Sequence, residues 1–380
     1  MIARAKPIVT KFNIFFLIIP GLILTFGKVT AQAQTEFQSL FAHYSQTNQD
    51  LDQNEDDKIN NVDFSYLLGA PTVTPTPTVT PEPSQTLRGV RTQASSCSDQ
   101  DEINELLDTL EHAKVNTIYY SVFWLKAYYH SNIMPHHSFD SLAYLVPQAH
   151  ARGIEVFALI TAGKLGWREH SEWNARLNSP EIEDDWLDFR IPAARQFVAD
   201  VAVEVEQYGI DGILLDYIRW APAWSNFDCE ENAGVITQTV EMVNNSVSIP
   251  VTASVFRNRA HSTNAGQLWY NWLNEGIVDY VTPMLYTWRT NNPDGHPDQV
   301  SEILAEIAEW NASGLFPDRI IPRLSTWFFR PDPDQAKTVN QVLLEIETCY
   351  NAGATSMTLW DDRELSRNPN LVEALRNDGW

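Results

Sequence analysis

The region from Thr86 to Trp380 alternates short β-like runs with amphipathic helical stretches, and this alternation constrains the fold more than any other feature. The β-like runs are Leu87–Gln93, Asn116–Trp124, Ile154–Thr161, Gly212–Arg219, Ile249–Phe256, Val278–Trp288, Arg319–Trp327 and Thr355–Asp361. Eight strand–helix repeats in about 295 residues match the size of a (β/α)8 TIM barrel, an α/β fold. The alternative is a doubly wound sheet, which would usually carry a Gly-rich phosphate loop, and the sequence has none.

The first 33 residues have the pattern of a secretory signal. Basic residues (Arg4, Lys6, Lys11) precede the apolar stretch Phe12–Phe26, and an A-x-A cleavage pattern ends at Ala33. The apolar stretch is short for a membrane span, so an uncleaved anchor is the alternative. We therefore expect a secreted or cell-envelope protein.

A Pro/Thr-rich linker, residues 71–85, separates a small N-terminal module, residues 34–70, from the predicted barrel, residues 86–380. The alternation of Pro and Thr favours extended polyproline II over helix or sheet. The sequence therefore predicts two modules joined by a semi-rigid spacer.

The small module contains an acidic loop that fits an EF-hand type calcium site. Side-chain oxygens stand at loop positions 1, 3, 5, 9 and 12 and a backbone carbonyl at position 7, where they can surround a hard cation. The predicted ligands are Asp52, Asn54, Asp56, Lys58, Asn60 and Asp63. Asp57 stands at position 6, where Gly is usual, and position 12 is Asp rather than Glu. The alternative is a solvated acidic loop between two helices.

This loop resembles the calcium loop of type I dockerins, D-x-N-x-D-x-x-I-N-x-x-D. The resemblance implies calcium as the cofactor and a cohesin-like protein as a partner. Dockerins carry two such loops and this sequence has one, which weakens the expectation of a cohesin-like partner.

The charge balance limits the partners of the chain. It has 26 Lys+Arg against 49 Asp+Glu, a net charge of −23. This excess of negative charge argues against nucleic acid and anionic membrane surfaces as partners. It fits neutral or cationic ligands, and we expect a monomer that needs no cofactor for catalysis; the expectation of a carbohydrate polymer as partner comes from the aromatic residues described below.

The three cysteines allow at most one internal disulfide. Cys97 and Cys229 follow the first and fourth predicted strands, on the same side of the barrel, so a bond between them is one hypothesis. The alternative is that all three cysteines, including Cys349, are small buried residues.

Aromatic residues gather where the predicted strands end, which is the end of a TIM barrel that carries function. Seven of the 13 Trp follow strand ends: Trp124, Trp167, Trp220, Trp224, Trp288, Trp327 and Trp360. Flat aromatic surfaces at an acidic barrel mouth suit stacking on sugar rings. We predict substrate contacts for Trp124, Trp220, Trp288, Trp327 and Trp360. The alternative is that these Trp residues pack beneath the loops.

The run I-D-G-I-L-L-D-Y-I-R-W supplies the strongest catalytic candidate. Strand alternation places Gly212 and Asp216 on the inner face, so Asp216 points into the barrel near its rim. Asp211 lies at the opposite end, where a structural role is expected. Arg219 is the nearest cation in sequence and is predicted to contact the substrate or pair with Asp216.

Glycoside cleavage normally uses two carboxylates, and the second one is less clear from the sequence. Asp361, at the end of the last predicted strand, is the best-placed candidate for the second catalytic residue. The alternatives are Asp362, Glu169, Glu172 and Asp294.

Two further residues are predicted to bind the substrate. Tyr286 ends the sixth predicted strand, where its phenol can donate to a sugar hydroxyl or a nucleophile. Arg88, on the first strand, is a candidate for a buried cation that partners an interior carboxylate.

Several motifs resemble bacterial glycosyl hydrolase-like family 10 across Arg88 to Trp360: R-G-V, V-N-T-I-Y-Y-S-V, A-H-A-R-G-I-E-V-F-A, I-D-G-I-L-L-D-Y-I-R and V-D-Y-V-T-P-M-L-Y. The resemblance implies a (β/α)8 glycosidase of bacterial envelope or extracellular glycans, peptidoglycan-type strands included. The family's motif residues fall on Asp211, Asp216, Arg219 and Tyr286. This chain has Arg91 where the family usually has Trp and Phe157 where His is frequent, and both changes bear on the substrate subsite.

The leading hypothesis is a secreted glycoside hydrolase of a bacterial or environmental polysaccharide. In it, Asp216 acts as nucleophile or charge stabiliser, and Asp361 protonates the leaving oxygen. The alternative is a non-catalytic carbohydrate-binding barrel tethered by the calcium module.

Overall fold

The computed structural model describes residues 86–93, 97–164, 186–220, 232–287, 299–328 and 336–379, together with the backbone of two short strands near the N-terminus. The chain divides into two compact units, Met1–Thr80 and Pro81–Trp380. In the first unit, β1 (Phe15–Ile19) pairs antiparallel with β2 (Leu22–Phe26). Both strands fall inside the apolar stretch of the predicted signal.

Several residues singled out in the sequence lie outside the described residues, so their predicted roles stay predictions. They are the calcium ligands Asp52, Asn54, Asp56, Lys58, Asn60 and Asp63, the tryptophans Trp167, Trp224 and Trp288, the carboxylates Glu169, Glu172 and Asp294, and Cys229.

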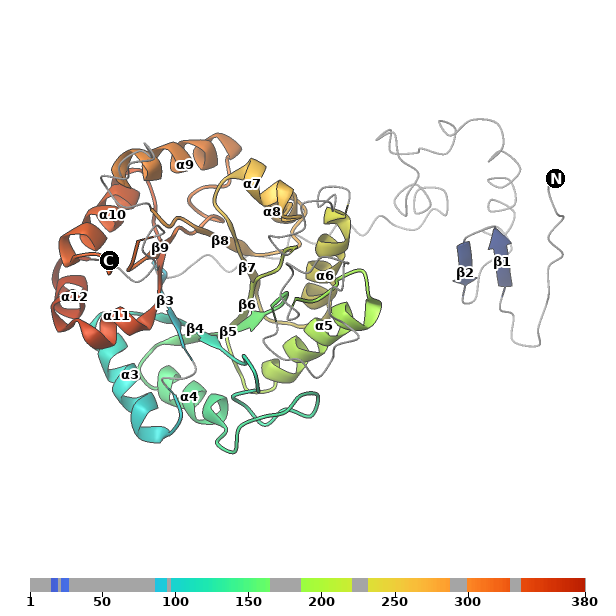
Figure 1. Cartoon of the computed structure of the whole chain (residues 1–380), viewed down its shortest axis with the longest axis horizontal. Coiled ribbons are helices and arrows are strands. Elements are labelled where there is room, and N and C mark those ends of the chain that lie inside the picture. Colours follow the sequence, from blue (N-terminus) through green and yellow to red (C-terminus); the bar gives the residue numbers. More distant parts are fainter. Residues whose placement is uncertain are drawn as a thin grey trace, which may run out of the picture. The chain divides into compact units, whose positions relative to one another are not determined.

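The second unit is a closed barrel of eight parallel strands, which confirms the predicted (β/α)8 fold (Figure 1). In order around the ring, the strands are β10 (Met357–Trp360), β3 (Arg88–Thr92), β4 (Thr117–Ser121), β5 (Glu155–Thr161), β6 (Gly212–Asp216), β7 (Val251–Phe256), β8 (Tyr280–Met284) and β9 (Arg323–Ser325). Each strand falls within a predicted run. Most strands end earlier than the sequence suggested, and β6 stops at Asp216 rather than at Arg219.

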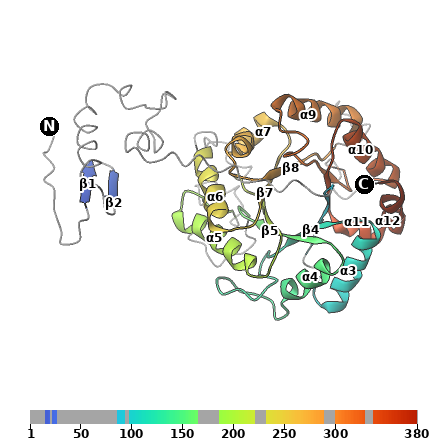
Figure 2. The same ribbon diagram turned by 180° about the vertical axis from the view of Figure 1, so that it is seen from behind.

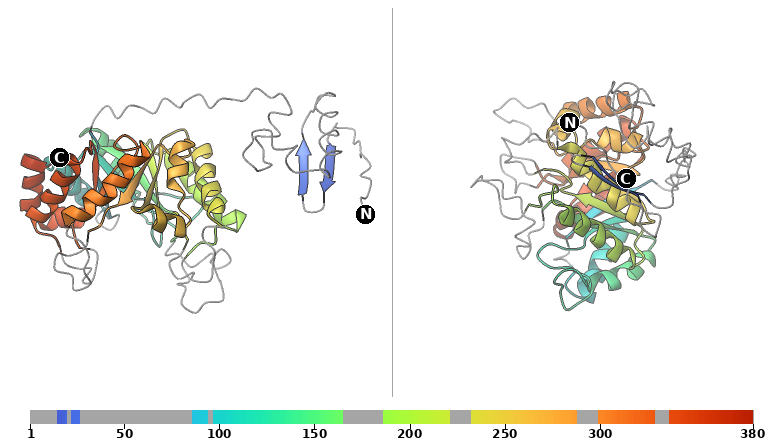
Figure 3. Two further views of the ribbon diagram at one scale, coloured as in Figure 1. Left: turned by 90° about the horizontal axis from the view of Figure 1, so that it is seen from above. Right: turned by 90° about the vertical axis from the view of Figure 1, so that its right-hand side faces the viewer.

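Helices surround the barrel on its outer side, as seen from the front and from behind (Figures 1 and 2). They are α3 (Gln100–His112), α4 (Ser141–His150), α5 (Pro192–Glu206), α6 (Ala233–Ser246), α7 (Arg259–Asn264), α8 (Trp269–Asn274), α9 (Gln299–Ser313), α10 (Val339–Asn351), α11 (Asp362–Arg367) and α12 (Pro369–Ala374), followed by the π-helical turn η3 (Leu375–Gly379). The views in Figure 3 show the strands and helices of the barrel from two further sides.

The first of these helices illustrates why the amphipathic stretches became helices. Asp99 caps α3, where its side chain accepts from the backbone N–H of Glu102. Ile103, Leu107 and Leu110 repeat at helical spacing and are buried. A helix with one apolar stripe is stable when it covers an apolar surface, and here that surface is the outer face of the barrel.

The strands place alternate residues inside the barrel and outside it. The inner face holds a small aromatic and aliphatic cluster of Tyr119, Phe157, Leu159 and Leu214. Gly212 lies on the same face, where an added Cβ would lie 2.2 Å from the Phe157 ring, so no larger residue fits there. The packing confirms the alternation predicted for β6 and leaves Asp216 as its last inward-pointing residue.

Among the described residues, Arg323 of β9 is a fully buried arginine in the interior of the barrel. Its Nη1 donates to Ser254 Oγ at 3.1 Å and its Nε to Thr358 Oγ1 at 3.3 Å. The sequence predicts this interior cation at Arg88, and that prediction is wrong. Arg88 lies on the outer face of β3, beside Tyr350 of α10, because the adjacent residue Gly89 faces the interior. Arg323 therefore takes the interior position that the sequence predicts for Arg88.

Cys97 and Cys349 are both free thiols and both are buried. The hypothesis of a disulfide from Cys97 to Cys229 is therefore not supported, and Cys97 fits the alternative of a small buried residue. Burial raises the pKa of both thiols, which leaves them protonated and unreactive. Across the part of the chain that the structure describes, no helix is both long enough and apolar enough to cross a membrane.

Candidate active site

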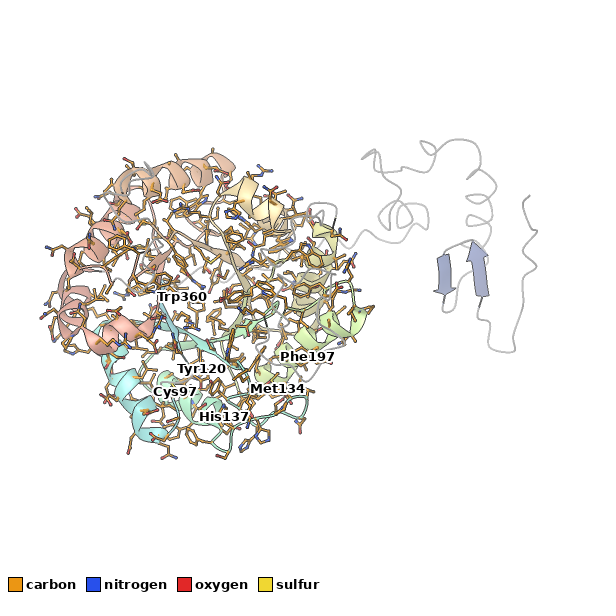
Figure 4. The ribbon with its side chains drawn as sticks, viewed as in Figure 1. Cys97, Tyr120, Met134, His137, Phe197 and Trp360 are labelled. Atoms are coloured by element: carbon orange, nitrogen blue, oxygen red, sulfur yellow. The ribbon has the colours of Figure 1, made fainter. Side chains whose placement is uncertain are left out.

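A pocket of about 350 Å³ opens among the carboxyl ends of the barrel strands, where TIM barrels carry their functional residues. Residues of five strand ends contribute to its wall. The lining residues are Arg91, Gln93, Ser121, Phe123, Trp124, Tyr128, Thr161, Asp216, Tyr217, Trp360, Asp361 and Arg363. In Figure 4 the labelled Trp360 lies nearer the barrel axis than His137 does.

Asp216 ends β6 and lines the pocket as predicted, with 4% of the residue exposed. It pairs in register with Thr161 of β5. Its Oδ1 accepts from the backbone N–H of Tyr217 at 2.9 Å. Within the described ranges, no hydrogen bond occupies its Oδ2. Asp216 therefore offers one carboxylate oxygen to a ligand.

The backbone turns abruptly after Asp216. Tyr217 has φ of 53°, a left-handed conformation that bulky residues rarely adopt. Its ring meets the Trp186 ring edge-on, with centroids 5.7 Å apart. Strained backbone of this kind is held in place by its surroundings and is common at functional sites. The turn ends β6 and keeps the carboxylate of Asp216 at the rim.

Asp361 lines the same pocket, but its oxygens are surrounded by donors. Its Oδ2 accepts from Gln93 Nε2 at 3.1 Å and from Arg363 Nε at 3.1 Å. The ion-pair partners Arg363 Nη2 and Arg91 Nη1 lie 3.1 Å and 3.6 Å from the same oxygen. Its Oδ1 accepts from the backbone N–H of Arg363 at 3.2 Å and so caps α11. Asp361 is therefore fixed in place by its neighbours, in contrast to Asp216.

The neighbouring carboxylate, Asp362, lies behind the pocket wall and is not among its lining residues. Both its oxygens are 3.3 Å from the backbone nitrogen of Gln93. Burial, and next the charge of Asp361, raise the pKa of Asp362 to about 7. Asp362 is thus a structural carboxyl of the β3–α11 contact, which leaves Asp361 as the second pocket carboxylate.

Several buried polar atoms in this region have no hydrogen-bond partner among the described residues. They are Ser121 Oγ, Thr161 Oγ1, Tyr286 Oη and Arg91 Nε. Buried polar groups are normally paired, so unpaired ones that face a pocket mark where a polar ligand or water belongs. The sequence did not single out Ser121 or Thr161, although both are the last inward-pointing residues of their strands.

Tyr286 lies beside this pocket, with its ring 6.2 Å from that of Trp360. Burial raises the pKa of its phenol, while the nearby charge of Arg323 acts in the opposite direction. The phenol therefore keeps its proton, and the predicted donation of a hydrogen bond to the substrate stays a prediction.

The tryptophans separate into two groups. Trp124 is 39% exposed and lines the pocket, as does Trp360. Trp327 is partly buried, and its ring lies 5.9 Å from that of Tyr286. Trp220 was predicted to stack on sugar and does not: it is fully buried against Phe189, with ring centroids 5.8 Å apart. Trp220 therefore fits the alternative of packing beneath the loops.

Arg219 is also turned away from the pocket. Its guanidinium lies over Trp186 at 4.8 Å and over Phe256 at 5.0 Å, and it donates to the carbonyl of Trp220 at 3.1 Å. Within the described part of the chain it forms no ion pair with Asp216, which corrects the expected pairing. The arginines that line the pocket are Arg91 and Arg363.

The described ranges contain no cluster of three or more His, Cys, Asp or Glu side chains that could hold a metal ion. The predicted calcium loop lies outside these ranges.

A family model described as "Putative glycosyl hydrolase domain" matches residues 89–365. A comparison with curated protein sequences found no match.

Among solved structures, the chain resembles the PgaB (BpsB) glycoside hydrolase domain from Bordetella bronchiseptica, with a TM-score of 0.61, 15% identity and coverage of 77% of this chain and 98% of that chain. It also resembles the C-terminal domain of a putative chitinase from Desulfitobacterium hafniense DCB-2, with a TM-score of 0.51, 10% identity and coverage of 77% and 100%. The spore cortex-lytic enzyme SleL of Bacillus cereus matches with a TM-score of 0.50, 12% identity and coverage of 77% and 73%. At these identities the likeness shows the fold.

Proposed function

The chain belongs to the family described as "Putative glycosyl hydrolase domain", and from this premise we propose that it hydrolyses glycosidic bonds at the pocket that holds Asp216. One observation carries the proposal. Asp216 keeps an unoccupied carboxylate oxygen in a pocket whose Ser121 and Thr161 hydroxyls are buried and unpaired in the described residues. A ligand with many hydroxyl groups, such as a sugar, would pair these atoms.

Asp216 has the role that needs a free oxygen beside the reacting sugar. It acts as nucleophile, or it stabilises the oxocarbenium-like transition state by its charge. Trp124, with its exposed ring, and Trp360 provide apolar surfaces for the faces of the sugar rings. The Tyr286 phenol donates a hydrogen bond to a sugar hydroxyl or to Asp216.

Asp361 is the second carboxylate of the proposal. The donors of Gln93 and Arg363 around its Oδ2 suit a charged oxygen rather than a protonated one. Asp361 therefore protonates the leaving oxygen only if Arg363, whose side chain is 45% exposed, turns away from it in the substrate complex. With Arg363 in place, Asp361 stabilises the positive charge that develops on the sugar and positions the side chains of Arg91 and Arg363.

The substrate that we propose is a bacterial or environmental polysaccharide, with peptidoglycan-type strands included. The predicted secretory signal supports this, because an exported enzyme meets such polymers outside the cell. The narrower assignment to glycosyl hydrolase-like family 10 belongs to the same proposal. We also propose that the N-terminal module is a dockerin-like calcium site that tethers the barrel.

The test is the release of reducing ends from a panel of purified glycans. We expect turnover on at least one glycan, and Asp216→Asn should reduce it by about 10³-fold. Asp200→Asn is the matched control, because Asp200 is exposed on α5 and pairs only with Gln196 in the described residues. An Asp216→Asn protein that keeps wild-type turnover would contradict the assignment.

A second candidate function, a non-catalytic glycan-binding barrel, is favoured by the crowded oxygens of Asp361. In that case Asp216→Asn would still bind the glycan, and the wild-type protein would release no reducing ends from any glycan that it binds.

A further inference from the structure

We propose that Arg91 and Arg363, on the β10–β3 side of the pocket, form a subsite for a sugar that carries a carboxylate. This inference rests on the proposed function, because it names the substrate class of the same pocket. It begins from the hydrogen-bond donors of Arg91.

Arg91 has more donors than the described residues satisfy. Its Nε is buried without a partner, and its Nη1 is 3.6 Å from Asp361 Oδ2, which is too long for a hydrogen bond. That oxygen already accepts closer donors from Gln93 and Arg363. The Arg91 guanidinium lies 4.4 Å from the centre of the Trp360 ring, which supports it from one face. Arg91 is therefore a positioned cation whose own acceptor has to come from a ligand.

The charges on this wall do not balance. Two guanidinium groups meet one carboxylate, Asp361, and the next carboxylate, Asp362, does not line the pocket. Among the described lining residues, this wall therefore carries one positive charge in excess. Such an excess is notable in a chain with a net charge of −23, because it favours an anionic group at this wall against the overall charge of the chain.

The opposite side of the pocket carries a carboxylate, that of Asp216. β6, which ends in Asp216, stands three strands from β3 and four from β10 in the ring of eight, so it lies across the barrel from Arg91 and Asp361. A sugar that points its carboxylate at the arginines would thus turn its remaining groups toward Asp216. The pocket orients an acidic sugar by charge, and the volume of about 350 Å³ is in the range of small-ligand sites.

A carboxylate fits these donors better than a neutral group does. Arginine presents parallel N–H groups that match the two oxygens of a planar carboxylate. Uronic acids and amino sugars with a lactyl ether both carry this group. Both classes offer a carboxylate to the arginines and differ in where it is attached to the sugar ring, so the test uses both.

The experiment compares each acidic oligosaccharide with its carboxyl-reduced counterpart. The probes are a glucuronic acid-containing and a muramic acid-containing oligosaccharide, and kcat/KM is measured for all four compounds. We expect the wild-type protein to prefer at least one acidic form by tenfold or more, chiefly through KM. Arg91→Gln should lower this preference at least fivefold. Arg91→Lys should restore only part of it, since lysine keeps the charge and loses the fork of donors.

Arg363→Gln is the second variant and guards against misfolding of Arg91→Gln, because Arg363 is partly exposed. Arg367→Gln is the matched control on the same helix, 71% exposed, and should keep the wild-type preference. Equal rates on the acidic and reduced forms, or arginine variants that slow both forms equally, would overturn the subsite.

The two proposals fail in distinguishable ways. Hydrolysis of neutral glycans without any acidic preference removes the subsite and keeps the enzyme. Preferential binding of the acidic probes by Asp216→Asn, with no hydrolysis by the wild-type protein, keeps the subsite and removes the enzyme.

Discussion

The two ends of β6 carry the same residue type in opposite conditions. Asp211, at the amino end, accepts from the backbone N–H of Val156 at 2.7 Å and from His150 Nε2 at 2.8 Å, both on Oδ2. Asp216, at the carboxyl end, accepts one backbone hydrogen bond from the residues that the structure describes, and its other oxygen faces the pocket without a partner among them. Only four residues separate them in the motif D-G-I-L-L-D.

The difference separates polar groups that stabilise the barrel from polar groups that are available to a ligand in the pocket. The hydrogen bonds of Asp211 join the start of β6 to that of β5 and to the end of α4. Around Asp216, the hydroxyls of Ser121 and Thr161 have no partner in the described residues. Satisfied groups add to stability, whereas unsatisfied buried groups cost free energy until a ligand pairs with them. Substitutions at the two ends should therefore act on different properties.

The largest effect is expected from Asp216→Asn. Catalysis should fall by about 10³-fold, or about 4 kcal/mol of transition-state stabilisation, because the amide cannot supply the negative charge. The thermal midpoint should stay at or above the wild-type value, since a nearly buried charge is removed. Activity assays and calorimetry on the same protein preparation measure the catalytic rate and the thermal midpoint. A large loss of stability without loss of activity would reverse the comparison between the two ends.

The next largest effect is expected from the double variant Ser121→Ala, Thr161→Ala. The value of kcat/KM should fall by about 30-fold, because a bound sugar loses two hydrogen bonds. Folding stability should be unchanged or slightly higher, since the hydroxyls have no partner in the described residues of the free protein. As a control, Thr109→Ala removes a hydroxyl on α3 that bonds to the carbonyl of Glu105. Its kcat/KM should match the wild type.

Asp362 offers a third case, a mouth-side carboxyl that does not face the pocket. Its pKa, raised to about 7 by burial, exceeds the unfolded value, so the folded state binds the extra proton. Stability should therefore fall as pH rises from about 4 to about 7. Asp362→Asn should gain about 1–2 kcal/mol at pH 8, an advantage that disappears near pH 4. Denaturant unfolding at the two pH values measures this. A variant less stable than wild type at pH 8 would contradict the assignment.

The sequence predicted the barrel well because the hydrophobic patterns that specify its strands and helices are periodic. Each strand is a short apolar run and each helix carries an apolar stripe, and both patterns repeat along the chain. Alternation within β6 also placed Asp216 at the rim, since the side-chain period of a strand is two.

The sequence predicted less of the site, because the remaining contacts join residues far apart along the chain. Arg91 and Asp361 meet only when the barrel closes β3 on β10. Trp220 and Arg219 were expected in the pocket because they follow β6, but the left-handed turn at Tyr217 sends the chain away from it. A change of chain direction at a single residue cannot be predicted from amino-acid composition or from the spacing of apolar residues. Asp211 directly precedes β6, and there the predicted structural role agrees with its hydrogen bonds.

The smallest effect is expected from Asp211→Asn, and it completes the comparison. The asparagine keeps an oxygen that can accept from Val156 and loses the charge that attracts His150. Stability should fall by about 1 kcal/mol, a modest loss because the His150 contact is partly exposed to solvent. Turnover should equal that of the wild type, because Asp211 lies at the end of the barrel away from the pocket. Chemical denaturation and the reducing-end assay measure the two quantities. If Asp211→Asn instead lost activity while keeping its stability, the amino end of β6 would share in the chemistry, and the division between satisfied and unsatisfied carboxylates would fail.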